Sequence, residues 1–284
     1  MEEIEKFNTS LEILLKTVVH NKASDLHIVS RSEPQIRIDG TLRPLELGVL
    51  SGHDIQDICY ALITDVQKSD LEENRELDFA IELPGVGRFR GNYYYTMNGD
   101  LAAAFRIIPT DIPSLDDLRA PAIFKEVVKR EKGLILVTGP TGSGKSTTLA
   151  AMLNEINLNE RKHIITVEDP VEFVHTNKKG LFSHRNVGVD TKSYAKALKS
   201  ALREDPDIIL VGELRDRETI STAITAAETG HLVFGTLHTN SAIQTINRII
   251  DSFEGGEQLQ VRNMLSVSLT AVISQALRPK IGSG

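Results

Sequence analysis

The chain has 284 residues, 40% of them hydrophobic and 25% charged, which is an ordinary balance for a folded protein of one large domain or two average ones. Its net charge is −7, and its basic residues are mostly interleaved with acidic ones. Bulk affinity for nucleic acid needs clustered Lys and Arg, so we expect no nucleic-acid partner. A local basic groove is the remaining alternative. No apolar run approaches the ~18 residues of a membrane span, so we expect no transmembrane segment.

Cys59 is the single cysteine of the chain. An intrachain disulfide is therefore impossible, which fits a protein of the reducing cytosol. Apolar neighbours with helical spacing surround it, so we expect Cys59 in a core rather than as a nucleophile. These neighbours are Ile55, Ile58, Ala61 and Leu62.

Residues 1–109 have the pattern of a small α+β domain. Ser10 is a candidate cap for a first helix, and a second helix is expected over roughly 53–64. Elsewhere apolar and polar residues alternate, which predicts strands of an antiparallel sheet separated by turn signals. The alternating residues are Leu26 and Ile28; Ile36 and Ile38; Phe79 and Ile81; Phe89, Tyr93 and Tyr95; and Leu101, Ala103, Phe105 and Ile107. The turn signals are Asp39-Gly40, Pro84-Gly85 and Asn98-Gly99.

Pro109 and Pro113 bracket a short polar segment, so residues 110–117 are expected to be a linker. Residues 118–284 alternate short apolar runs with helical patterns, which is typical of a parallel sheet covered by helices on both faces. The predicted strands are Leu134–Thr138, Ile164–Val167, Ile208–Val211 and Leu232–Leu237. A last clear helix is expected to open at Thr239, Asn240 or Ser241 and to carry Ile243, Ile246, Ile249, Ile250 and Phe253 on one face.

A candidate phosphate-binding loop follows the first of these strands. Gly139, Gly144, Lys145 and Ser146 have the full G-x-x-x-x-G-K-S spacing of a Walker A motif. Glycines let backbone N–H groups surround phosphate oxygens, the lysine reaches the outer phosphates, and the serine hydroxyl is a ligand for Mg²⁺. We therefore expect an ATPase that binds ATP and Mg²⁺. The predicted nucleotide-binding residues are Gly139, Pro140, Thr141, Gly142, Ser143, Gly144, Lys145, Ser146 and Thr147.

Acidic residues and histidines lie next to the other predicted strands. Glu168 and Asp169 follow the second strand, and Glu213 follows the third after one glycine. His231 and His238 flank the fourth strand. Ligands of open α/β sheets bind beyond the carboxyl ends of the strands, so we expect these groups to converge on the edge that bears the phosphate loop. For any single acid, a helix cap or a solvated loop is the alternative.

Together with the Walker A motif, four further blocks resemble the secretion ATPase superfamily, and within it the type IV pilus retraction ATPases. Ser24–Ile28 resembles the start of the small domain, and Val167–Phe173 resembles the Asp box. Leu210–Asp216 resembles the atypical Walker B motif, in which glutamate replaces the usual aspartate. Gly230–Asn240 resembles the His box. The resemblance extends over residues 24–281, which is nearly the whole chain.

This resemblance implies a PAS-like N-terminal domain joined to a RecA-like ATPase domain, in a cytoplasmic homohexamer. Such a ring is peripheral to the inner membrane, where it binds a pilus platform protein and uses ATP hydrolysis to displace pilin subunits. By the same resemblance, Glu213 is the catalytic glutamate that polarises water, and Glu168 and Asp169 lie near Mg²⁺ and the γ-phosphate. His231 and His238 sense the nucleotide at the subunit boundary.

Retraction, rather than pilus extension or type II secretion, is favoured by two features. The small domain begins at the chain start, without the leading domain of extension motors, and Ala271–Gln275 resembles the retraction class. The resemblance also implies that a C-terminal helical region is truncated, together with the short Ala-Ile-Arg-Ala-Gly element that retraction needs. Two other hypotheses are a nucleotide-gated accessory scaffold that scarcely hydrolyses ATP, and a nucleic-acid translocase or conjugation ATPase.

Three arginines of the small domain are candidates for a role in a neighbouring subunit. Arg88 and Arg90 share one face of a predicted strand, and Arg106 follows on the neighbouring run. One hypothesis is that they project into the nucleotide site of the next subunit and stabilise charge on the transferring phosphoryl group. The alternative is that they face solvent on an edge of the sheet.

Overall fold

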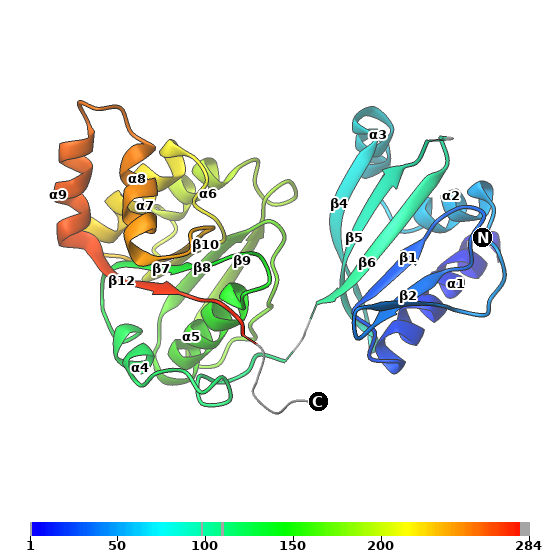
Figure 1. Ribbon diagram of the computed structural model, residues 1–284, viewed down its shortest axis with the longest axis horizontal. Coiled ribbons are helices and arrows are strands. Elements are labelled where there is room, and N and C mark those ends of the chain that lie inside the picture. Colours follow the sequence, from blue (N-terminus) through cyan, green and yellow to red (C-terminus); the bar gives the residue numbers. More distant parts are fainter. Residues whose placement is uncertain (1, 98, 109–110, 279–284) are drawn as a thin grey trace. The chain divides into compact units, whose positions relative to one another are not determined.

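Figure 1 shows the computed structural model of the chain, which describes residues 2–97, 99–108 and 111–278, with side chains from residue 11 onward. Asn98 of one predicted turn, and Pro109 with the start of the predicted linker, lie outside these residues. The chain divides into two compact units, Met1–Thr110 and Asp111–Gly284. Among the described residues, none of the helices combines the length and the apolar character that crossing a membrane requires.

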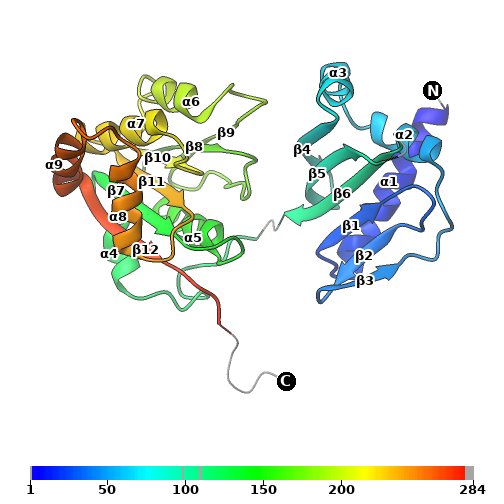
Figure 2. The same ribbon diagram turned by 45° about the horizontal axis from the view of Figure 1, so that its top comes forward.

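The first unit is an antiparallel sheet with helices packed on one face. Its six strands have the order β3-β2-β1-β6-β5-β4 (Figure 2). Every neighbouring pair is antiparallel, as the alternating apolar pattern predicts. In chain order the elements are α1 Glu2–His20, β1 Asp25–Ile28, β2 Gln35–Ile38, β3 Thr41–Pro44, α2 Gly52–Tyr60, α3 Asp65–Asn74, β4 Glu76–Leu83, β5 Gly87–Tyr95 and β6 Leu101–Ile108.

Alternate strand residues and one stripe of α1 and of α2 form the core of this unit. The rings of Phe79, Tyr93 and Phe105 pack edge to face, with centroids 4.7 to 6.3 Å apart. Such pairs add about 0.5–1.5 kcal/mol to the burial of the rings. Cys59 is fully buried, as predicted, and burial raises the pKa of its thiol to about 12. Because the thiolate is the reactive form, Cys59 is inert at neutral pH.

Helix boundaries in this unit differ from the prediction. α1 begins at Glu2, so Ser10 lies inside the helix rather than at its cap, because the preceding Glu and Lys residues are good helix formers. The helix expected over roughly 53–64 is α2, which ends earlier, at Tyr60. The next helix, α3, was not predicted, and a capping box formed by Thr64 starts it. α3 buries only Leu71, and β3 is exposed along its length, so neither element has a clear apolar period.

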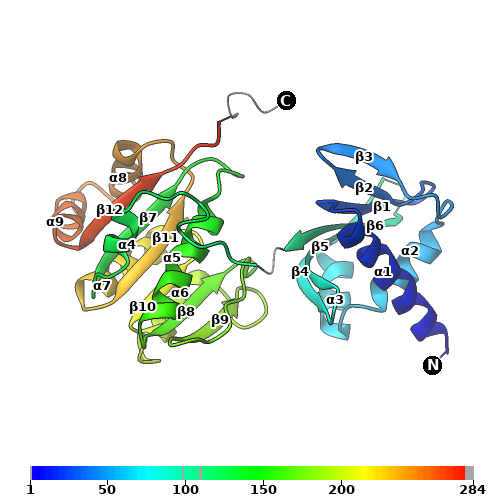
Figure 3. The same ribbon diagram turned by 90° about the horizontal axis from the view of Figure 1, so that it is seen from below.

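The second unit is a six-stranded parallel sheet with helices on both faces, which confirms the predicted α/β fold. Figure 3 shows its strands in the order β12-β7-β11-β10-β8-β9. In chain order the elements are α4 Ile123–Val127, β7 Gly133–Thr138, α5 Lys145–Asn159, β8 His163–Glu168, β9 Leu181–Asn186, α6 Tyr194–Ala201, β10 Ile208–Val211, α7 Arg217–Glu228, β11 Leu232–Leu237, α8 Ala242–Asp251, α9 Gln258–Ser268 and β12 Leu269–Ser274.

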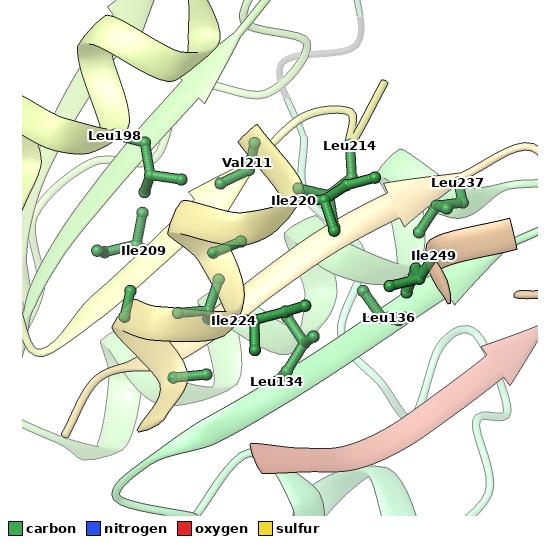
Figure 4. Close-up of a cluster of buried hydrophobic side chains, with 14 of the residues drawn as sticks. Leu134, Leu136, Leu198, Ile209, Val211, Leu214, Ile220, Ile224, Leu237 and Ile249 are labelled. Atoms are coloured by element: carbon green, nitrogen blue, oxygen red, sulfur yellow. The ribbon is translucent and has the colours of Figure 1, made fainter. Parts of the chain in front are cut away.

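Two layers of apolar side chains cover the faces of this sheet. On one face, Leu134 and Val211 of the strands pack with Ile220 of α7 (Figure 4). On the other face, further strand residues pack with α4 and with Met152 of α5. Leu115, within the segment predicted as a linker, is buried in this second layer. Both faces are therefore covered, which explains the continuous apolar runs of β7, β10 and β11.

Four elements of this unit were not predicted, namely α4, α9, β9 and β12. β9 and β12 are the two edge strands and are only partly buried, so they lack a continuous apolar run. α8 is capped by Ser241, as predicted, and Ile249 and Ile250 are buried. Ile243 was expected on the same apolar face but is 74% exposed. The stripe that packs on the core starts one turn later, at Ile246.

Candidate active site

The candidate phosphate loop connects β7 to α5. Its Gly139, Gly142 and Gly144 have φ angles of 146°, 77° and 89°, which other residues rarely adopt, so glycine permits the turn. The ammonium group of Lys145 donates to the carbonyl oxygens of Gly139, at 2.9 Å, and of Pro140, at 3.0 Å. The loop therefore wraps around the lysine that starts α5.

This loop has the features of an anion site. A Cβ built on Gly142 meets no atom within 4 Å, so the space beside the loop is open. The hydroxyl of Ser143 is buried and has no hydrogen-bond partner within the described part of the chain. Burial lowers the pKa of Lys145, and the carboxylates of Glu213 and Glu172 oppose that shift. A half-desolvated cation, an unpaired hydroxyl and a helix N-terminus together fit a phosphate group.

Two strand ends bring acidic residues close together at this edge. Glu168 is the last residue of β8, and β10 lies beside β8 in parallel register. The N–H group of Gly212 donates to the carbonyl oxygen of Val167 at 2.8 Å. A Cβ on Gly212 would come within 3.3 Å of the Cα of Glu168 and of the hydroxyl of Tyr194, so glycine permits this close approach. Glu213 follows directly, at the same edge.

Glu213 is a largely buried carboxylate, with 19% of its side chain exposed. Its Oε2 lies 2.6 Å from Nε of Arg215, and its Oε1 lies 3.5 Å from Nε2 of His238. The hydroxyl of Thr236 donates to the carbonyl oxygen of Gly212 and fixes the backbone just before the glutamate. The carboxylate is thus held between two basic groups on the side of the sheet that bears the lysine.

The two predicted histidines lie at opposite ends of β11. Leu237 pairs with Thr138, so His238, the next residue, lies at the edge of the phosphate loop. His231 precedes β11 and its Nδ1 lies 3.0 Å from the carbonyl oxygen of Ala226. The six residues of β11 separate the two histidines by about 20 Å. The expectation that His231 converges with the other groups of one chain is therefore wrong, because it lies at the start of the strand and not at its end.

The other predicted residues lie close to this edge. Asp169 is the first residue after β8. Burial raises the pKa of the Tyr194 phenol, and the negative charge of Asp169 raises it further. Ser146 and Thr147 are half-buried in the first turn of α5, and Thr141 is exposed in the loop. The structure thus brings the whole predicted loop, the two Asp-box acids, the Walker B glutamate and one of the two histidines to one edge of the sheet.

Several residues of the site were not predicted as site residues, although Arg215 and Gln275 lie within two of the blocks that carry the resemblance. Arg215 and Tyr194 contact the acidic strand ends, as described above. Gln275, after β12, donates from Nε2 to the hydroxyl of Thr148 at 2.8 Å. A Cβ on Gly139 would lie 2.3 Å from the carbonyl oxygen of Gln275, so β12 packs directly on the phosphate loop. Only the pairing of β12 with β7 reveals this contact, because the two residues are far apart in the chain.

The three candidate arginines lie on the sheet face of the first unit that is opposite its core. Arg90 pairs with Arg106 across β5 and β6, and Arg88 lies two residues before Arg90. β5 lies between β4 and β6, so these positions are not on an edge strand. Nε of Arg106 lies 2.7 Å from Oδ1 of Asp25, and Arg90 lies 3.5 Å from Asp78. The side chain of Arg106 is nonetheless 72% exposed.

Comparison with known proteins gives consistent matches over nearly the whole chain. The family described as Type II/IV secretion system protein matches residues 2–283. The Type IV pilus retractation ATPase PilT of Pseudomonas aeruginosa is 53% identical over 262 residues, which cover 92% of this chain and 76% of that protein. A twitching motility protein of Neisseria gonorrhoeae is 51% identical over 268 residues, which cover 94% of this chain and 71% of that protein.

A solved structure has the same fold. A crystal structure described as the pilus retraction motor PilT and bound ADP superimposes with a TM-score of 0.92 and 51% sequence identity. The match covers 95% of this chain and 79% of that chain. The similarity therefore includes both units and the phosphate loop.

Proposed function

Because the chain belongs to the Type II/IV secretion system protein family, we propose that it works as an ATP-hydrolysing ring motor of type IV pilus retraction. The family, the ATPase activity and the retraction class that the sequence predicts are confirmed by the relatives described above. A ring of six copies on the cytoplasmic side of the inner membrane, bound to a pilus platform protein, is part of the proposal.

One juxtaposition carries the proposal, namely the lysine of the phosphate loop and the carboxylates at one sheet edge. Lys145 is desolvated enough for its pKa to fall, and Glu213 acts on it electrostatically. Glu168 lies beside Gly212, and Gly212 directly precedes Glu213 in the chain. Phosphoryl transfer to water needs a cation for the phosphates and a base for the water, and we propose Lys145 and Glu213 for these two roles.

We propose these roles for the residues of the site. The loop residues 139–147 bind the phosphates of ATP, with Lys145 on the outer ones. The hydroxyl of Ser146, with Glu168 and Asp169, would hold Mg²⁺, which when bound neutralises charge on the phosphates. Glu213 orients the attacking water and takes its proton.

The histidines and arginines are proposed to act at boundaries between copies. Nε2 of His238 lies 3.5 Å from Oε1 of Glu213, and we propose that this contact couples the histidine to the state of the nucleotide. His231 lies at the other end of β11, so its proposed role is limited to contact with a nucleotide that a neighbouring copy binds. Arg88, Arg90 and Arg106 are proposed to supply positive charge to the site of the next copy.

Pilus extension, type II secretion and an accessory scaffold are the alternatives within the same machinery. A scaffold requires little turnover, whereas a complete phosphate loop with Glu213 at the same end of the sheet supports the proposal of an active ATPase. A nucleic-acid translocase predicts hydrolysis that DNA stimulates. The net charge of −7 disfavours that alternative.

Steady-state phosphate release by the purified chain, with ATP and Mg²⁺ and with or without DNA, tests the ATPase proposal. We expect turnover that DNA does not change, and images of the same sample with ATP that show rings of six copies. Complementation of a bacterium that lacks its retraction ATPase tests the direction of force. Turnover without rings contradicts the hexamer, and turnover that rises with DNA favours the translocase.

A further inference from the structure

The chain between β8 and β9, residues 169–180, forms a strap that starts with the acidic residues of the site. Val171, Phe173 and His175 are buried, whereas Glu172 and Val174 are exposed, so the strap is extended and alternates between inside and outside. The carboxylate of Glu172 acts on the ammonium group of Lys145. The strap is not a regular strand, so its position depends on contacts with other elements.

The acidic start of the strap is tied to the sheet. The N–H group of Glu172 donates to Oε2 of Glu168 at 3.3 Å, and that of Val171 donates to Oδ1 of Asn186 at 2.8 Å. Farther along, the N–H group of His175 donates to Nε2 of His184 on β9 at 3.1 Å. These contacts hold the first half of the strap against β8 and β9, and its far end leads directly into β9, where the N–H group of Phe182 donates to Oδ1 of Asn177 at 2.9 Å.

One residue of the phosphate-loop helix makes four hydrogen bonds to the far end of the strap. Asn157 of α5 is 1% exposed. Its Nδ2 donates to the carbonyl oxygen of Thr176 at 2.9 Å, and its Oδ1 accepts from the N–H group of Lys178 at 3.1 Å. Its own carbonyl oxygen accepts from the N–H groups of Lys179, at 2.9 Å, and Gly180, at 3.3 Å. A buried side chain amide that meets one donor and one acceptor of a single segment is a specific clamp.

Other residues at positions 157 and 180 would break these contacts. Aspartate at 157 accepts from Lys178 but does not donate to Thr176, and leucine at 157 does neither. A Cβ on Gly180 would lie 3.2 Å from Oδ1 of Asn157 and 3.2 Å from the carbonyl oxygen of Lys162, so glycine allows the strap to pass close to α5. The local geometry is therefore built around an asparagine.

We propose that Asn157 is a positioning residue for ATP hydrolysis. α5 begins with Lys145 and carries Asn157 three turns later, so one rigid helix fixes both the phosphates and the strap that carries Asp169 and Glu172. The clamp sets the distance between the acidic residues and the phosphate loop without touching the nucleotide. This inference rests on the proposed role of the Asp-box acids in hydrolysis.

Asn157→Ala, Asn157→Asp and the control Asn159→Ala test the inference in the full chain. Asn159 lies on the same helix, and its side chain bonds only to Glu155 among the described residues. For each variant, three quantities are measured: kcat for phosphate release, the Kd of a fluorescent ADP analogue, and amide hydrogen exchange of residues 171–180. The Asp variant keeps one side-chain bond and supplies the test where the Ala variant does not fold.

We expect Asn157→Ala to speed exchange in the strap and to lower kcat by ~10-fold, because displacement of a reacting group by about 1 Å is costly. The Kd should stay within about 2-fold, since the loop itself is intact. Asn157→Asp should lower kcat at least as much as Asn157→Ala, because it buries a carboxylate beside the carbonyl oxygen of Thr176. Faster exchange with an unchanged kcat overturns the inference, as does a parallel loss of kcat and affinity. A parent chain without turnover contradicts the proposed function instead.

Discussion

The ammonium group of Lys145 lies 2.9 Å from the carbonyl oxygen of Gly139, the first residue of the phosphate loop. The side chain thus folds back onto the loop that precedes it. Burial lowers its pKa, and Glu213 opposes that shift. Among the described residues, the ammonium group bonds to two neutral carbonyl oxygens, and a cation in this position gains more from a phosphate anion than from such partners. The loop is therefore arranged in advance for the ligand.

Lys145→Ala tests this arrangement. We expect turnover to be lost and nucleotide affinity to fall, because the outer phosphates lose their cation, while the fold stays intact. Phosphate release and binding of a fluorescent nucleotide measure the two effects. Lys196→Ala, on the exposed side of α6, is the matched control and should behave as the parent. Near-normal phosphate release by the Lys145 variant would contradict the P-loop assignment itself.

Glu213→Gln separates binding from chemistry. Glutamine keeps the shape of the side chain and can still contact Arg215, which lies 2.6 Å from the carboxylate in the parent. It does not accept a proton from water, so we expect ATP affinity to persist and hydrolysis to fall by at least ~100-fold. Single-turnover phosphate release measures the loss. Weakened binding with unchanged turnover would make Glu213 a structural residue.

His175 gives the stability of the chain a dependence on pH. Burial, with a smaller effect of His184, lowers the pKa of His175 from 6.5 to about 3, and its ring stacks on Phe182 with centroids 4.3 Å apart. The unfolded chain therefore binds the proton first, so stability falls as the pH drops from 6.5 towards 3. At pH 5 the loss is about 2 kcal/mol for this one group.

The variant His175→Phe keeps the stacking and removes the titration. We expect its melting temperature to fall less than that of the parent between pH 7 and pH 5, by several degrees. Thermal unfolding followed by circular dichroism at both pH values measures the difference. His53→Gln, which removes an exposed histidine, is the matched control. Equal pH dependence of the parent and His175→Phe would show that His175 is not the group responsible.

The phosphate loop and the acidic residues of the site were predictable because each is defined by consecutive residues of the chain. The spacing from Gly139 to Ser146 defines the phosphate loop, and Glu213 directly follows a buried strand. Residues whose partners lie far away in the chain gave no such signal. Asn157 contacts a segment about twenty residues later, and Gln275 meets the loop only because β12 pairs with β7.

The fold was predictable for its buried strands and for the edge strand β4, in which Phe79 and Ile81 follow the two-residue period of a strand. β7, β10 and β11 are covered on both faces, so their apolar runs are unbroken. The other edge strands, β3, β9 and β12, were not predicted, because burial does not follow residue type in them; Leu42 of β3 and Leu181 of β9, for example, are exposed. His231 was misplaced although the sequence shows that it precedes the predicted strand, which in a parallel sheet puts it at the end opposite to the phosphate loop.

Catalysis shared between copies is the last prediction, and it concerns Arg88, Arg90 and Arg106. Asp25 holds Arg106 at 2.7 Å, yet the arginine remains largely exposed, so it is fixed in direction and open to an anion from outside the unit. An arginine supplied by a neighbouring subunit is worth ~10³ or more in rate. If one of the three has this role, its Ala variant should fold, bind ATP and hydrolyse it poorly. Arg43→Ala, on exposed β3, is the matched control.

Mixing two inactive variants distinguishes sharing from a defect within one chain. An inactive arginine variant and Lys145→Ala, allowed to exchange subunits, should regain part of the activity, because an intact phosphate loop then meets an intact arginine across a boundary. Neither variant alone should do so, and assembly of each is checked by light scattering. If all three single variants hydrolyse ATP at the parental rate, the arginines serve only the sheet face on which they lie, where Arg106 pairs with Asp25 and Arg90 with Asp78.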